Sequence, residues 1–112
     1  MAQNIKYWTP FDTIKITAAA AHAAGDLIKN GNWYGVCIDD IAITKEGMIA
    51  INPIVELIKK TSTDVIASGA LIEFVAGGTV QEWEAGTKIG KAHAASGATE
   101  TKVLVKMMPE LY

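Results

Sequence analysis

The spacing of glycine and other turn-forming residues is the feature that most constrains the fold of this chain. Ten glycines are spread along the 112 residues. Asn, Asp, Ser and Thr lie near them, so the apolar residues occur only in short runs. Short apolar or alternating runs that are separated by turn signals are typical of β-strands. We therefore predict a mainly β domain built from many short strands.

The clearest strand is residues 13–17, which alternate in polarity and are rich in β-branched side chains. The pair Asn30-Gly31 predicts a hairpin turn between residues 27–28 and residues 33–38. Glycine-containing turns at 45–47, 68–69 and 77–78 predict further strands at residues 48–51, 70–75, 79–81, 87–92 and 101–106.

Two segments carry helix signals. Residues 18–24 are rich in alanine and are followed by Gly25, as at the C-terminal end of a helix. Residues 52–60 begin with Asn52 and Pro53, which are typical of a helix start, but they also fit a strand with Pro53 at an edge or bulge. The pattern favours neither interpretation of residues 52–60. We expect at most one short helix in the fold.

No repeat, low-complexity linker or block of charge divides the chain. We therefore expect a single β-rich domain over residues 12–112, preceded by an extended N-terminal arm at residues 1–11. This length and an apolar fraction of 50% are sufficient for one hydrophobic core.

The charged residues argue against nucleic acid as a partner. All ten basic residues are Lys, no Arg is present, and the formal net charge is −2. Nucleic-acid binding usually needs a clustered basic face. The apolar runs are too short to cross a membrane, and the N-terminus lacks the apolar stretch of a secretory signal. We therefore expect synthesis in the cytoplasm and no membrane partner.

The candidate catalytic residues lack a supporting motif. Cys37 lies within an apolar strand, where a buried and unreactive thiol is the usual outcome. His22 and His93 both stand in Ala-His-Ala, and their spacing fits no metal-binding motif. We predict no catalytic residue, metal site or cofactor, and hence no enzyme activity.

Two acidic pairs have equally simple interpretations. Asp39-Asp40 follows an apolar run, where aspartates commonly start a turn. Glu82 and Glu84 flank Trp83, and two acids around one tryptophan are weak support for a glycosidase site. No glycine-rich phosphate-binding loop is present.

Both ends of the chain carry large apolar side chains outside the expected core strands. Such side chains in short segments commonly bind a partner, although the N-terminal arm could instead fold back onto its own domain. The residues predicted to bind a partner are Ile5, Tyr7, Trp8, Pro10, Phe11, Met107, Met108, Leu111 and Tyr112.

The order of these local features resembles the small capsid cement, or head decoration, proteins of tailed bacteriophages, a family formerly described as a domain of unknown function. The resemblance covers residues 12–106, and each matching motif is short and centred on glycine or on a strand. The matching segments are residues 12–18, 24–26 with 34–36, 42–47 with 55–57, 66–72, 86–92 and 98–105.

The resemblance implies a small antiparallel β-barrel or β-tulip-like domain and favours a strand with a bulge at Pro53. It also implies a non-enzymatic virion protein that binds the exterior of an expanded capsid and cements neighbouring capsomers. The implied partners are the major capsid protein and two further copies of the chain in a homotrimer. An exterior position agrees with the absence of arginine.

Two other functions remain open from the residues. One is a small ligand- or carbohydrate-binding β module in which Trp33 and Trp83 are stacking platforms. The other is a hydrolase that uses Cys37 with His22 or His93, for which the sequence offers little support.

Overall fold

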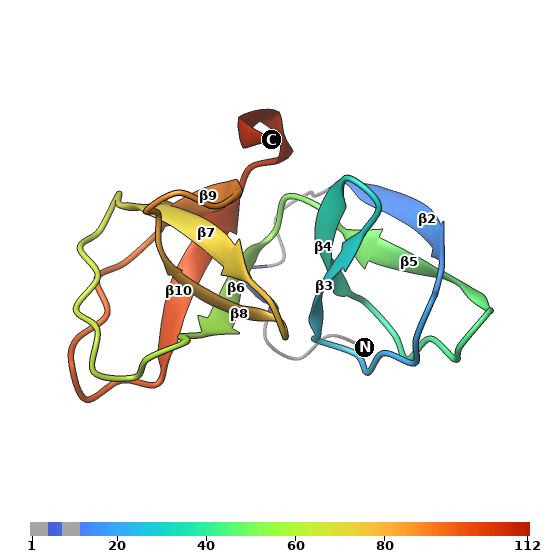
Figure 1. The fold of residues 1–112 in the computed structure, drawn as a ribbon, viewed down its shortest axis with the longest axis horizontal. Coiled ribbons are helices and arrows are strands. Elements are labelled where there is room, and N and C mark those ends of the chain that lie inside the picture. Colours follow the sequence, from blue (N-terminus) through green and yellow to red (C-terminus); the bar gives the residue numbers. More distant parts are fainter. Residues whose placement is uncertain (1–4, 8–11) are drawn as a thin grey trace.

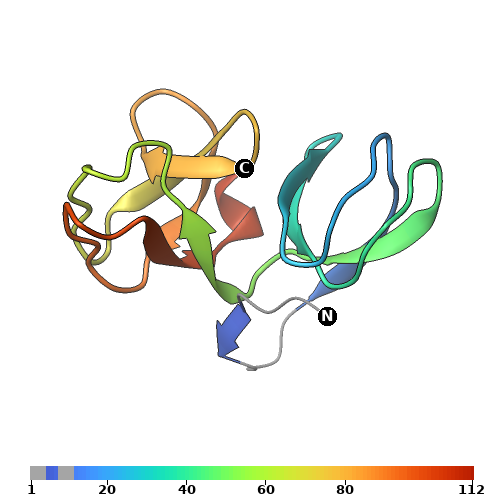
Figure 2. The same cartoon turned by 90° about the horizontal axis from the view of Figure 1, so that it is seen from below.

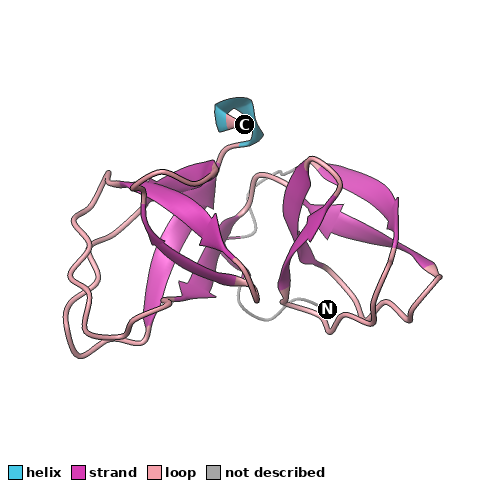
Figure 3. Cartoon of the chain, in the orientation of Figure 1, coloured by secondary structure: helices cyan, strands magenta, loops and turns pink. Residues whose placement is uncertain are grey.

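The computed structural model describes residues 5–7 and 12–112, which form two antiparallel β-sheets and one short 3-10 turn (Figures 1 and 3). The strands are β1 (Ile5–Tyr7), β2 (Thr13–Thr17), β3 (Leu27–Asn30), β4 (Trp33–Cys37), β5 (Glu46–Ala50), β6 (Ile54–Ile58), β7 (Leu71–Val75), β8 (Thr79–Glu82), β9 (Lys88–Ala92) and β10 (Lys102–Met107), and the turn η1 spans Pro109–Leu111. The prediction of a mainly β fold is confirmed.

The larger sheet has the strand order β1-β6-β10-β9-β7-β8 and curls until its two sides meet. Just beyond β6, the N–H of Lys59 donates to the Thr101 carbonyl at 3.0 Å, on the β10 side. The N–H of Lys60 donates to the Val80 carbonyl at 2.8 Å, on the β8 side. Two successive amides thus join opposite sides of the sheet, and β6 to β10 form a closed ring that we call the barrel.

The barrel depends on one very close approach between strands β9 and β10. Gly90 lies opposite Met107, and a Cβ atom at Gly90 would overlap the carbonyl oxygen of Lys106. Any other residue at this position would force the two strands apart.

The smaller sheet has the order β2-β5-β4-β3 and forms the second lobe of the molecule (Figures 1 and 2). One face of this sheet has its own apolar cluster, which includes Ile16, Ile28, Cys37 and Ile49. Ile41 covers the cluster and lies against Gly47, where any side chain would collide with it.

A second and larger apolar cluster joins the two sheets. Leu27, Tyr34, Val36 and Ala50 of the smaller sheet are buried together with the barrel interior. The barrel residues of this cluster are Val55, Leu57, Ile66, Ile72, Val80, Ile89, Ala92, Val103, Val105 and Met107. One face of the smaller sheet therefore packs into an apolar cluster of its own, and the opposite face packs into the cluster that it shares with the barrel.

The helix signals of residues 18–24 do not produce a helix. This segment is an extended loop in which His22 and Ile41 exchange backbone hydrogen bonds of 2.9 Å in both directions. A seven-residue helix would gain few internal hydrogen bonds, and pairing with a distant segment satisfies the backbone instead. Gly25 has a φ of 92°, but it occupies a turn and not a helix end.

Within residues 52–60, Ile54–Ile58 form strand β6, so the strand that the family resemblance favoured is confirmed over its central part. Burial alternates through Ile51, Pro53, Val55 and Leu57, which all point into the protein. Pro53 precedes the first residue of the strand, and its carbonyl still accepts a hydrogen bond of 3.0 Å from the Met107 N–H. Its missing N–H therefore interrupts no strand pairing.

The predicted turns at 68–69 and 77–78 are confirmed, with positive φ angles at Gly69 and Gly77. The β3–β4 hairpin is also confirmed, but its two turn residues are Gly31 and Asn32, because Asn30 still pairs with Trp33. The turn predicted at residues 45–47 lies slightly earlier. There, the Lys45 N–H donates to the Ala42 carbonyl at 3.0 Å, and Thr44 takes a φ of 65°. Glu46 and Gly47 already belong to β5.

Candidate functional surfaces

An aromatic hollow lies where the C-terminal turn meets the smaller sheet. The volume of this aromatic hollow is about 780 Å³. Its lining consists of Lys29, Asn32, Trp33, Tyr34, Thr87, Pro109 and Tyr112. The Trp33 side chain is 44% exposed there, whereas Tyr34 is buried.

Tyr112 fixes the C-terminal turn to the edge of β4. Strand β5 pairs with β4 only over Val36 and Cys37, so it does not reach Tyr34. The Tyr112 hydroxyl donates to the Tyr34 carbonyl at 3.0 Å and accepts from the Tyr34 N–H at 3.3 Å. Partial burial raises the pKa of Tyr112 above its ordinary value, which favours the protonated hydroxyl that donates this bond.

The rings around Tyr34 hold this contact in place. The Tyr112 ring meets the Tyr34 ring edge-on, with centroids 4.9 Å apart, and the Phe74 ring lies 5.1 Å from Tyr34 on a tilted plane. The Tyr34 hydroxyl also contacts the Thr87 hydroxyl at 3.3 Å. The wall of the hollow is thus built from both sheets and the C-terminal turn.

A second surface surrounds Trp83, which is 38% exposed. Its indole N–H donates to the Gly86 carbonyl at 2.9 Å, and the Lys88 amine lies over its ring, 4.3 Å from the centroid. The indole donor and a ring face are therefore already occupied within the chain.

The loop that carries Trp83 is held by a buried carboxylate. Glu73 is 5% exposed, and it accepts hydrogen bonds from the backbone amides of Glu84, Ala85 and Gly86 at 3.2, 3.2 and 2.6 Å. The Gln81 side-chain amide donates to it as well. The Gln81 bond, followed by the backbone bonds, holds the pKa of Glu73 below its usual value despite its burial.

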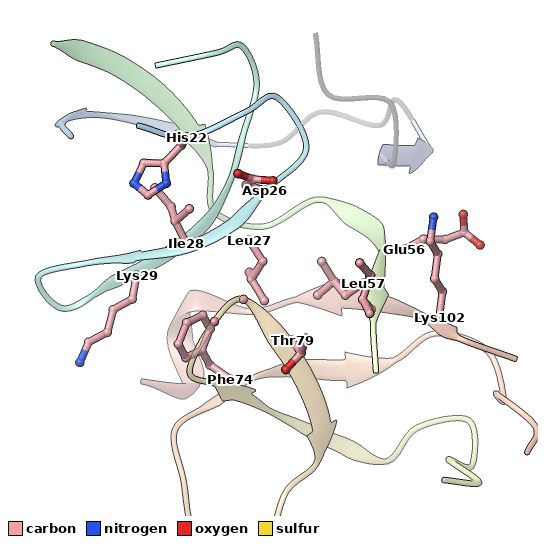
Figure 4. Close-up of a pocket in the computed structure, with 13 residues that line it drawn as sticks. His22, Asp26, Leu27, Ile28, Lys29, Glu56, Leu57, Phe74, Thr79 and Lys102 are labelled. Carbon is pink, nitrogen blue, oxygen red and sulfur yellow. The ribbon is translucent and has the colours of Figure 1, made fainter. Parts of the chain in front are cut away.

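A groove of about 500 Å³ runs between β3, β6 and the β7–β8 turn (Figure 4). Leu27, Leu57 and Phe74 point into it, while Glu56 and Lys102 stand together at one end. The β7–β8 turn abuts β3 so closely that a Cβ atom at Gly78 would lie 2.8 Å from the Leu27 carbonyl oxygen. With its apolar centre and scattered charges of both signs, this groove is the seam between the two lobes.

The structure places the candidate catalytic residues apart from these surfaces or only at their rims. Cys37 is fully buried, and its burial raises its pKa to about 11, so the thiol is protonated and inaccessible at neutral pH. His22 lies at the rim of the inter-sheet groove, and His93 is exposed. Asp40 accepts a hydrogen bond of 2.8 Å from the N–H of Ala24, which lies 16 residues earlier, so this carboxylate joins two loops.

The predicted partner-binding residues fall into three groups. Trp8, Pro10 and Phe11 lie outside the described residues, and Ile5 and Tyr7 belong to β1, which pairs with β6 at the edge of the larger sheet. Met107 is fully buried in the shared core. Met108, Leu111 and Tyr112 are half-buried at the C-terminal turn, where only Tyr112 lines the aromatic hollow. A partner-binding role for these residues stays a prediction.

Sequence reasoning missed the polar residues that are buried. Lys59 is 4% exposed, and its amine donates to the carbonyls of Asp64 and Gly97 at 2.7 and 2.9 Å. Ser96 is also buried, and its hydroxyl donates to the Lys102 carbonyl at 2.8 Å. Lys59 stands two residues after the buried Leu57, in the alternating pattern of β6. That position in the pattern was the only feature of the sequence that could have predicted its burial.

Within the described part of the chain, no group of three or more His, Cys, Asp or Glu residues could hold a metal ion. No helix over these residues is long and apolar enough to cross a membrane.

Comparison with known proteins points to a phage structural component. The fold is similar to a solved structure titled as the head fiber gp8.5 N base of bacteriophage phi29, with a TM-score of 0.54 and 14% sequence identity. The alignment covers 89% of this chain and 96% of that chain. No curated protein matches the sequence. The family of phage cement proteins, however, matches residues 8–107, which span nearly the whole chain. The chain therefore belongs to the phage cement protein family and is a structural protein of the phage capsid.

Proposed function

We propose that this protein binds the outer surface of an expanded phage capsid and cements neighbouring capsomers as a homotrimer. The observation that carries the proposal is the family match, which extends over residues 8–107 and so includes every strand of both sheets except β1. The major capsid protein is the proposed partner, and the exterior of the virion is the proposed location.

Simple energetics support a multivalent clamp. A standard protein interface buries about 800 Å² on each partner. A trimer offers three such contacts, and linked contacts raise the overall affinity far above that of one contact. A clamp across a seam would oppose the outward stress of packed DNA.

The N-terminal arm is the proposed shell-contacting segment. Its β1 part occurs in this chain as an edge strand on β6, so its backbone is able to pair with a sheet edge. An equivalent pairing with an exposed edge of the shell protein would let Tyr7, Trp8 and Phe11 fill pockets there. At the other end of the chain, Met108, Leu111 and Tyr112 are proposed as contacts with the shell or a neighbouring copy.

Binding to purified expanded and unexpanded capsids tests the proposal. We expect saturable binding to expanded capsids only, a rise in their thermal stability, and a trimer mass in light scattering of the bound or free protein. Deleting residues 1–11 should abolish binding. Because the deletion also removes β1 from β6, the triple variant Tyr7→Ala, Trp8→Ala and Phe11→Ala should be tested beside it.

Val65→Ala is a matched control, since this apolar side chain is 70% exposed and far from the arm in sequence. It should bind at normal occupancy. Normal occupancy of the folded arm variants would contradict the role of the arm. Failure of the intact protein to bind expanded capsids would contradict the cement function itself.

A further inference from the structure

We propose that the aromatic hollow is a binding site for an acidic saccharide. In this site the Trp33 ring is the stacking platform, and the Lys29 amine is the partner of the sugar carboxylate. Tyr112 lines this hollow and is also a proposed contact residue. The saccharide proposal concerns the free chain, however, and does not depend on capsid cementing.

The dimensions and lining of the hollow suit a small ligand. Its volume of about 780 Å³ lies within the range of about 300–1,000 Å³ that is common for ligand pockets. The lining combines aromatic rings with a few polar groups, as such sites usually do. Sugar rings present apolar C–H faces and polar edges, so they match a surface of this composition.

Trp33 is the side chain placed to stack on a ring. It follows the two-residue hairpin turn, in which Gly31 adopts a φ of 61°, and it pairs with Asn30 at the start of β4. Its indole is 44% exposed at the hollow. Trp83, by contrast, has its indole N–H bonded to Gly86 and a ring face under Lys88. Of the two tryptophans that the structure describes, the geometry therefore assigns the stacking role to Trp33.

The polar groups of the hollow favour a negatively charged sugar. Lys29 supplies the one cationic side chain of the lining, and no Asp or Glu lines the hollow. Its amine lies 5.9 Å from the centroid of the Tyr34 ring, on the side of the rings that form the wall. The Asn32 side-chain amide also lines the hollow and offers both a donor and an acceptor to sugar hydroxyls.

The site is also preformed, which lowers the entropy cost of binding. The Tyr112 hydroxyl is bonded to both backbone groups of Tyr34, and the Tyr34 hydroxyl contacts Thr87. These contacts hold the part of the lining formed by Tyr34, Thr87 and Tyr112 in place without any ligand.

Calorimetric titration of the purified full-length chain tests the proposal. The acidic probes are oligogalacturonate and sialyllactose, and the neutral probes are lactose and cellotetraose. We expect saturable binding of at least one acidic probe, weaker binding of the neutral probes, and a loss of affinity when salt is added. Trp33→Ala should weaken binding by about tenfold or more, which corresponds to about 1.4 kcal/mol.

Two matched pairs of variants separate the site from general effects. Trp83→Ala is the control for Trp33→Ala, and Lys45→Met, at an exposed lysine of another turn, is the control for Lys29→Met. Lys29→Met should remove the preference for acidic over neutral probes, while both controls should bind as the unmodified chain does. Thermal melting of each variant checks that it is folded.

Three outcomes would overturn the proposal. They are no saturable binding of either acidic probe at millimolar concentration, equal binding of acidic and neutral probes, and equal losses in the Trp33 and Trp83 variants. Because none of these measurements involves a capsid, failure here leaves the cement function untouched.

Discussion

The two sheets of this protein differ at their two sides, which are joined in the larger sheet and open in the smaller one. The larger sheet curls until one isolated bridge joins its two sides, where the Lys59 and Lys60 amides donate to the Thr101 and Val80 carbonyls. The smaller sheet stays open, with β2 and β3 as its edge strands. It is completed by residues from elsewhere, including Tyr112 at the edge of β4 and Asn30, whose side-chain amide donates to the Thr17 carbonyl at 3.2 Å.

This difference implies that the smaller sheet depends more than the barrel does on contacts with other parts of the chain. The strands of the barrel pair with one another around the ring, whereas the smaller sheet has two open edges and a contact with the C-terminal turn at β4. Edge strands with unpaired backbone groups are also the places where another chain is able to add a strand. The smaller sheet is therefore the more sensitive of the two lobes to changes elsewhere in the chain.

Core truncations in the two lobes give the largest expected effects. Ile72 and Ile49 are both fully buried, Ile72 in the shared cluster and Ile49 in the local cluster of the smaller sheet. Each change to Ala should lower the free energy of unfolding by about 2–5 kcal/mol. Hydrogen exchange should accelerate in both sheets for Ile72→Ala but only in β2 to β5 for Ile49→Ala. Equal acceleration in the barrel for both variants would show that the lobes do not differ in independence.

Glu73→Gln tests the carboxylate that fixes the β8–β9 loop in the barrel. We expect a loss of about 1.5–3 kcal/mol at neutral pH, since hydrogen bonds to a charged group are lost. Because the folded pKa is lowered, the contribution of Glu73 is present above its ordinary value of 4.5 and disappears as pH falls through the folded pKa. Denaturant melts from pH 7 downward should therefore converge for the two proteins. A constant gap at all pH values would contradict a role for the charge.

Lys59→Met tests the amine that ties the long barrel loops together. The Asp64 and Gly97 carbonyls would lose their donor, at an expected cost of about 1–3 kcal/mol. Exchange should accelerate in the loops at residues 60–70 and 93–101 and stay unchanged in β2 to β5. Lys60→Met, at the exposed neighbour, is the control and should have little effect. Faster hydrogen exchange in β2 to β5 of the Lys59→Met variant would contradict the view that the barrel is stabilised separately from the smaller sheet.

Tyr112→Phe gives the smallest and most local expected effect. It removes the hydroxyl that bonds the Tyr34 N–H and carbonyl but keeps the aromatic contact. We expect a loss of about 0.5–1.5 kcal/mol. The informative measurement is exchange of the Tyr34 amide, which should accelerate while amides of β9 and β10 stay unchanged. Unaltered protection of Tyr34 would mean that the open edge of β4 does not depend on the C-terminal turn.

Much of the strand pattern could be predicted from the sequence, because it depends on local signals. Alternation located β2, and Asn30-Gly31 located the β3–β4 hairpin. The segment at residues 52–60 was ambiguous, since Asn52 and Pro53 imitate a helix start. Pairing with β10 along the whole of β6 decides for the strand. That pairing is a long-range interaction and leaves no local signal.

The arrangement of the sheets and the surfaces could not be predicted in the same way. Closure of the barrel depends on Lys59 meeting Val80, and the sharing of the core depends on which sheet faces which. Trp33 and Trp83 look equivalent in the sequence. Only the positions of Gly86 and Lys88 beside one of them show that the two rings differ in availability.

The buried thiol of Cys37 has a practical consequence for chemical labelling. It is the only cysteine in the chain, it has no exposed surface, and its pKa is about 11. Maleimide reagents at neutral pH react with accessible thiolates, so the unmodified protein should stay unlabelled. One cysteine introduced at an exposed position such as Ile43 would then be the sole attachment point for a dye or a gold particle. Each copy of the protein on a particle would carry its label at the same known place.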